Sequence, residues 1–79
     1  MQVTDGNVKG SLQGDLVTIY ISGIEHFQGL SRATAGILLD TILTFVSTPA
    51  SYLFVYKGSV IHSPNIAPLG RVLSVLLNR

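Results

Sequence analysis

Residues 16–22 read LVTIYIS and carry the clearest strand pattern in the chain. The segment is rich in β-branched and aromatic residues, which fit the extended backbone of a sheet. Its two alternating faces consist of Leu16, Thr18 and Tyr20 on one side and of Val17, Ile19 and Ile21 on the other. Because both faces are largely apolar, we predict a central strand that is covered on both sides.

The residues before this strand predict a second extended element. Residues 3–12 read as a weak strand or hairpin, in which Asp5-Gly6-Asn7 separates Val3 from Val8. Glycine and asparagine tolerate positive φ, so this tripeptide favours a turn. Gln13-Gly14-Asp15 is a second turn signal, directly before the central strand.

A long amphipathic helix is predicted after the central strand. Ser22-Gly23 ends that strand, residues 24–29 form a link, and apolar residues recur at helical spacing over residues 30–46. Leu39 and Leu43, followed by Val46, widen the apolar arc beyond what one sheet would cover. We therefore expect a partner chain to bury a second side of this helix. Asp40 is interpreted as part of a solvent-facing polar stripe, with an intersubunit hydrogen bond as the alternative.

The C-terminal half predicts a strand and a second helix. Thr48-Pro49-Ala50-Ser51 is expected to close the first helix, and residues 52–56 form a strand. Lys57-Gly58 is either a hairpin turn before a returning strand at 59–61 or only a bend. The last helix begins with Asn65 as its cap or with Pro68 as its first residue. The predicted order is therefore β-β-α-β-α.

The segment His62-Ser63-Pro64-Asn65 lies where a strand is expected to meet a helix. Backbone N–H groups at a helix N-terminus attract anions, and His62 and Ser63 could add donors. Plain helix capping explains the same residues and is the favoured interpretation. His26 and His62 have no third ligand at metal spacing, so no metal site is predicted. No glycine elbow flanks Ser63, and we predict no catalytic residue and no enzymatic activity.

Composition narrows the function classes further. Hydrophobic residues make up 47% of the chain and charged residues only 11%, against a usual share of about 25%. A chain so poor in charge is expected to hide much of its exterior. The formal net charge is +1 and the five basic residues are far apart, which argues against nucleic-acid binding. The absence of cysteine excludes disulfides and thiolate chemistry.

A membrane span is the remaining alternative for the low charge. Between Ala33 and Tyr56 the only charged residue is Asp40. However, Pro49 and its polar neighbours divide this run, which then reads as helix, turn and strand. The N-terminal sequence MQVTDGNVKG lacks the basic and apolar regions of a secretory signal, so a cytoplasmic location is expected.

Residues 16–77 resemble the STAS domain of anti-sigma-factor antagonists. The resemblance consists of an apolar strand that ends in ISG at 21–23, an amphipathic helix, and the segment VIHSPNIAPL at 60–69. In this alignment the family's Asp falls on His62, its first Ser on Ser63, its phosphorylated Ser/Thr on Pro64 and its Gly on Asn65. Because Pro64 has no hydroxyl, the phosphorylation switch of the family is not expected. The resemblance implies the fold type and a protein-binding role, and it stops short of the final strand and helix that such domains carry.

Together these patterns predict one domain over residues 1–79, of the α/β class. We expect a small mixed sheet with two packed helices, completed by homodimerisation. The expected function is a non-enzymatic, self-associating and regulatory protein–protein interaction module that needs no cofactor, and the alternative is a dimer that binds a small apolar ligand or lipid. Its partners would be a second copy and another protein. The expected contact residues are His62, Ser63, Asn65, Ile66, Leu39 and Leu43.

Overall fold

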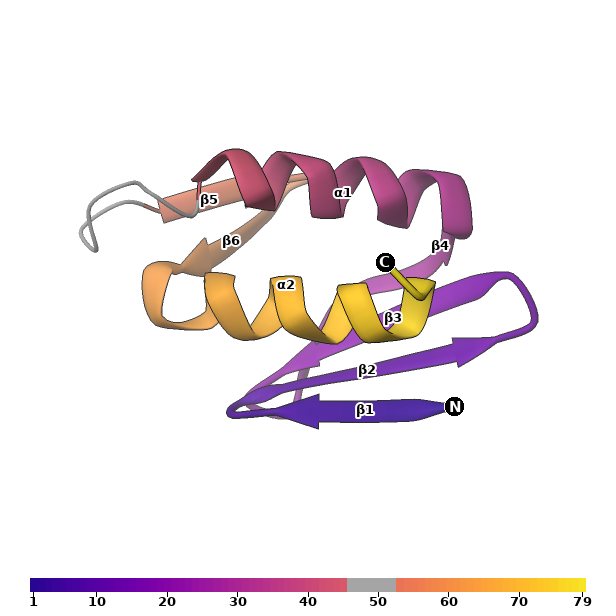
Figure 1. Cartoon of the computed structure of the whole chain (residues 1–79). Helices are drawn as coiled ribbons and strands as arrows, with labels where there is room; N and C mark the ends of the chain where they lie inside the picture. Colours follow the sequence, from indigo (N-terminus) through magenta and orange to yellow (C-terminus); the bar gives the residue numbers. More distant parts are fainter. Residues whose placement is uncertain (46–52) are drawn as a thin grey trace.

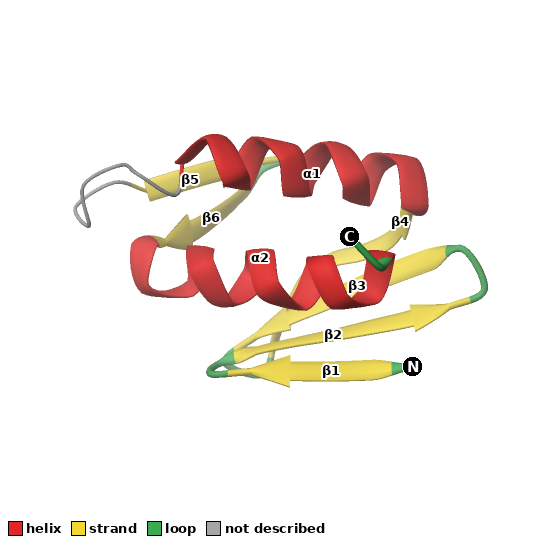
Figure 2. Cartoon of the chain, viewed as in Figure 1, coloured by secondary structure: helices red, strands yellow, loops and turns green. Residues whose placement is uncertain are grey.

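The computed structural model describes residues 1–45 and 53–79 (Figure 1). In chain order the elements are β1 (Gln2–Asp5), β2 (Val8–Gln13), β3 (Leu16–Ile21), β4 (Ile24–Ser31), α1 (Arg32–Phe45), β5 (Leu53–Tyr56), β6 (Ser59–His62) and α2 (Ser63–Leu77). The predicted α/β class with two packed helices is confirmed (Figure 2). The turn expected at 48–51 and the residues Val46 and Tyr52 lie outside the described residues.

The first four strands form one antiparallel meander in the order β1-β2-β3-β4. The strands β5 and β6 form a separate antiparallel pair. The expectation of a single mixed sheet is therefore wrong for the described residues. Each pair is joined by a two-residue turn, and a connection that short can only return the chain antiparallel.

Residues 24–29, which we expected to form a link, belong to strand β4. Ser22 and Gly23 have φ of 53° and 80°, so they make a tight hairpin turn instead of ending the sheet. The strand has irregular alternation, since Val17 pairs with Leu30 whereas Ile19 pairs with Phe27. The register shifts twice, between Val17 and Ile19 and again between Ile19 and Tyr20, and the first shift is a bulge near Gly29, whose φ is 67°. This bulge lets Phe27 and Leu30, three positions apart, both reach the core.

Helix α1 begins two residues later than expected because Leu30 and Ser31 complete β4. Ser31 then caps the helix, and its Oγ accepts a hydrogen bond of 3.1 Å from the backbone N–H of Thr34. Helix α2 begins at Ser63, earlier than both predicted starts, with His62 at the N-cap position. The segment His62-Ser63-Pro64-Asn65 thus forms the N-cap and first turn of α2, and Pro68 lies inside the helix.

The β5–β6 hairpin lies beside β4. Lys57 and Gly58 have φ of 50° and 83°, which settles the open choice in favour of a hairpin turn. The hydroxyl of Ser59 donates a 2.9 Å hydrogen bond to the carbonyl oxygen of His26. The rings of Phe27 and Tyr56 meet edge to face with centroids 5.9 Å apart. The β5–β6 hairpin therefore contacts the β4 edge of the larger sheet.

Both helices lie over the same face of the four-stranded sheet and pack against each other (Figure 1). The buried apolar residues form one cluster that includes Leu38, Leu39, Ile42, Leu69, Leu73 and Leu76. Leu39 is only 1% exposed. Packing within the chain thus covers Leu39 on the second apolar side of the first helix, where we had expected a partner, whereas Leu43 stays exposed. No helix of the described residues is long and apolar enough to cross a membrane.

Helix α2 approaches the sheet most closely at Gly10 on β2. A Cβ atom at this position would fall within 2.7 Å of Leu76 Cδ1, and closer still to Val72 Cγ1. Real side chains do not approach one another this closely, so only glycine allows the observed packing of the helix on β2.

We predict that Gly10→Ala destabilises the fold by about 1–3 kcal/mol, the usual cost of overpacking a filled core. Urea denaturation followed by circular dichroism measures this difference. Ser11→Ala, on the neighbouring residue of the same strand, serves as the control and should change stability by less than about 0.5 kcal/mol. Equal stability of Gly10→Ala and the wild type would contradict the close packing described here.

Candidate functional site

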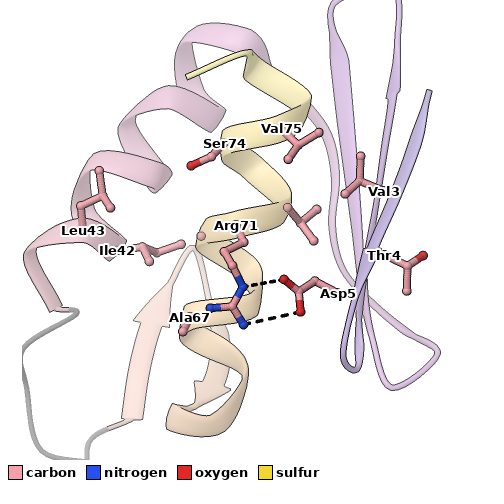
Figure 3. A pocket seen from close by; sticks show the side chains of 11 residues that line it. Val3, Thr4, Asp5, Ile42, Leu43, Ala67, Arg71, Ser74 and Val75 are labelled. Carbon is pink, nitrogen blue, oxygen red and sulfur yellow. Dashed lines mark hydrogen bonds and ion pairs between the residues drawn. The ribbon is translucent and has the colours of Figure 1, made fainter.

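A groove with a volume of about 550 Å³ is formed by α1, α2 and strand β1 (Figure 3). We call it the helix groove. Its lining residues are Val3, Thr4, Asp5, Ile42, Leu43, Ala67, Gly70, Arg71, Val72, Ser74 and Val75. Most of these side chains are apolar or small, so the groove offers an apolar surface to a binding partner.

Two apolar side chains of the helix groove are open to solvent in the single chain. Leu43 on α1 is 56% exposed and Val75 on α2 is 52% exposed. Val3 of β1 is half-buried and points toward α2, whereas Thr4 points away from it (Figure 3). Exposed aliphatic residues that line one hollow mark a surface suited to burial against another molecule.

An ion pair joins the β1 and α2 sides of the groove. Arg71 Nε donates to Asp5 Oδ2 at 2.5 Å, and Arg71 Nη2 donates to Asp5 Oδ1 at 3.5 Å. The hydrogen bond from Arg71 lowers the pKa of the Asp5 carboxyl and correspondingly raises the pKa of the Arg71 guanidinium. The two charged residues that line the groove therefore neutralise each other.

The predicted contact residues of the first helix have different positions. Leu43 lines the helix groove, as a contact surface requires. Leu39 lies in the core and is not accessible to another molecule. The periodic pattern did not separate them, because both residues were interpreted together as an extension of the apolar arc, and burial depends on which elements pack against each part of the helix.

The predicted contact residues at the start of α2 are also divided. Ile66 is buried in the core, Ser63 and Asn65 are half-buried, and His62 is exposed. His62 and Asn65 line a pocket of about 260 Å³ together with His26. The structure thus brings the two histidines to one pocket, because β6 lies beside β4. The role of these residues in partner binding stays a prediction.

No group of three or more His, Asp or Glu side chains gathers at metal-binding distance among residues 1–45 and 53–79. The histidine pocket contains no carboxylate among its lining residues. A divalent metal would find at most two imidazoles there, fewer ligands than a structural or catalytic zinc site uses.

The sequence patterns did not predict a contact role for four groove residues, Val3, Asp5, Arg71 and Val75. Asp5 and Arg71 are 66 positions apart, and no local pattern connects them. The available signal is Val75, an apolar residue that shares its helix side with Arg71 and Asn78. A valine within an otherwise polar stripe of a helix indicates a surface that contacts another molecule.

Compared with known protein families, curated proteins and solved structures, the chain shows no significant match. The resemblance to the STAS domain is not tested by these comparisons and stays a hypothesis.

We predict that Arg71→Gln raises the pKa of the Asp5 carboxyl toward its ordinary value, because the guanidinium that favours the charged form is lost. An NMR pH titration of the Asp5 side chain measures this change. Arg32→Gln, which removes an equal charge from the exposed start of α1, is the control and should leave the Asp5 titration unchanged.

The sign of the pH effect on stability follows from the same shift. Since the pKa of Asp5 is lower in the folded chain, the stabilisation is present above the unfolded pKa of about 3.9 and is lost as pH falls through the folded value. Identical Asp5 titrations in the wild type and in Arg71→Gln would show that the ion pair is absent in solution.

Proposed function

We propose that this chain is a non-enzymatic protein-interaction module that self-associates through the helix groove. The observation that carries the proposal is the exposure of Leu43 and Val75 in one apolar hollow. Burial of this surface would remove aliphatic side chains from water, which is the main source of free energy in protein association.

The composition of the chain supports the same proposal. Charged residues account for only 11% of the sequence, so little of the surface is strongly hydrated. Packing of α1 against α2 within the chain hides part of the apolar excess, and the groove brings together one exposed aliphatic residue of each helix, Leu43 and Val75. A patch that can meet its own copy closes symmetrically, so the simplest assembly is a dimer with twofold symmetry.

The proposal extends to a cytoplasmic setting and a regulatory role, of the kind that the resemblance to STAS domains implies. Another protein would then be a second partner. The exposed His62 and the half-buried Asn65 supply polar groups for such a contact, beside the apolar Ile24 and Val60, which are also exposed.

A second candidate function is the binding of a small apolar ligand or lipid by the same groove. Its volume of about 550 Å³ lies within the range of about 300–1,000 Å³ typical of ligand sites. Native mass spectrometry after gentle purification distinguishes the two candidates. A co-purified lipid or metabolite would favour this function, and a ligand-free dimer favours the interaction module.

We predict that the wild type sediments as a dimer at micromolar concentration and that Val75→Lys raises its dissociation constant at least about tenfold, equivalent to about 1.4 kcal/mol. The added ammonium group would have to leave water when the groove is covered. Because Val75 is exposed, the substitution should leave the fold of the single chain intact.

Ile37→Lys is the matched control. Ile37 is 59% exposed on α1 but does not line the groove, so this variant should dimerise as the wild type does. A wild type that stays a monodisperse monomer throughout the micromolar range would refute the proposed function.

A further inference from the structure

The two edges of the four-stranded sheet differ in how they are covered. Strand β4 contacts the β5–β6 hairpin through the Ser59–His26 hydrogen bond and through the edge-to-face contact of Phe27 with Tyr56. Strand β1 forms the other edge, and within residues 1–45 and 53–79 no strand pairs with its outer side (Figure 1). Such an edge presents unpaired backbone donors and acceptors to any strand that can align with it.

The hydrogen bonds between β1 and β2 determine which backbone groups face outward. Met1 and Leu12 exchange both of their backbone hydrogen bonds, at 3.0 and 2.9 Å. In the observed antiparallel register, hydrogen-bonded pairs alternate with non-bonded pairs, so Val3 and Asp5 also direct their N–H and C=O groups toward β2. The N–H and C=O groups of Gln2 and Thr4 therefore point away from the sheet.

We propose that β1 pairs antiparallel with β1 of a second copy, centred on Val3, so that two four-stranded sheets become one continuous sheet. In this register Gln2 of one copy lies opposite Thr4 of the other, and the two pairs use every outward backbone group of both residues. The inference rests on the proposed self-association and specifies its geometry.

The centre of this pairing places apolar side chains together. Val3 would face its own copy in a non-hydrogen-bonded pair, the arrangement that brings side chains closest across strands. Val3 points toward α2, and Val75 lies on the α2 wall of the same groove (Figure 3). The valines of the two copies would therefore form one cluster on the helix side of the joined sheet.

The position of α2 fits the same arrangement. The helix packs on both β1 and β2. With strands about 4.8 Å apart, a helix above this pair lies about 5 Å from the twofold axis. The two α2 helices would then be about 10 Å apart, which is close to the spacing of packed helices, and each would cover the other's groove.

Charges do not oppose this contact. Asp5 is already paired with Arg71 in its own chain, so Asp5 adds no unpaired charge to the helix side of the β1–β1 contact. On the opposite side of the sheet, uncharged Gln2 and Thr4 meet across the axis. Strand β1 lacks lysine, proline and any bulge, which are three of the devices with which protein edges prevent pairing. It is short, at four residues, and its one charged side chain, Asp5, is paired with Arg71.

Two substitutions test the pairing by sedimentation velocity. Thr4→Pro removes one outward N–H from each chain and leaves the β1–β2 hydrogen bonds in place, so we expect the dissociation constant to rise at least tenfold. Val3→Lys brings two ammonium groups together at the twofold axis and should give a monomer at micromolar concentration. Thr4→Ser, which keeps the N–H, and Leu16→Lys, at an exposed residue of β3, are the matched controls and should dimerise like the wild type.

The outcomes separate this inference from the proposed function. If the wild type dimerises and both test variants dimerise equally well, the β1 pairing is overturned while self-association stands. If the wild type is a monomer, both are overturned. Circular dichroism checks that each variant is folded. If a variant is not folded, isotope-filtered NOE measurements on the wild-type chain test the pairing instead. Methyl contacts between Val3 of one copy and Val3 of the other are expected. A dimer without these contacts would overturn the pairing.

Discussion

The structure depends on the packing of α2 against the sheet and against α1. Val72 and Leu76 of this helix lie on Gly10 of β2, and Gly70 is close enough to Ile42 of α1 that a Cβ atom there would be 3.2 Å from Ile42 Cγ2. The helix is the last element of the chain, yet it contacts β1 at the beginning. A small chain without cysteine has to be stabilised by such contacts, since it has no disulfide to restrict its unfolded state.

The same packing determines which surface remains for function. Leu39 is buried in the core, whereas Leu43, farther along α1, and Val75 on α2 stay exposed. The Asp5–Arg71 ion pair links the edge strand to the helix and keeps the groove electrically neutral. An apolar, neutral groove next to an unpaired strand edge favours another protein chain over a charged ligand, because both its side chains and its backbone groups can be satisfied by one partner.

Sequence patterns predicted the elements whose residues alternate or repeat regularly. The central strand at Leu16–Ile21 and both helices were located to within a few residues, since their buried positions follow the period of a strand or a helix. Strand β4 was missed because its bulge places Phe27 and Leu30 three positions apart, which breaks the alternation of a strand. The start of α2 was missed because Pro68, which can begin a helix, here lies inside one.

The candidate site was predicted less completely, for a different physical reason. Leu43 follows from the width of the apolar arc on α1, but the groove also requires Val3 and Arg71, whose proximity depends on how α2 lies over the sheet. The outward direction of the Gln2 and Thr4 backbone groups depends on the β1–β2 register. Contacts between distant segments are not encoded in local periodicity, and the register of this hairpin depends on the exact turn residues, which the tripeptide Asp5-Gly6-Asn7 left open.

Amide hydrogen exchange of β1, followed by NMR at millimolar concentration, tests the central claim most directly. In an isolated chain only the alternate amides of Val3 and Asp5 would be protected, by their bonds to β2. Pairing of β1 with a second copy predicts that the Gln2 and Thr4 amides are protected as well, and that this protection fades on dilution. Fast, concentration-independent exchange at Gln2 and Thr4, beside slow exchange at Val3 and Asp5, would contradict it.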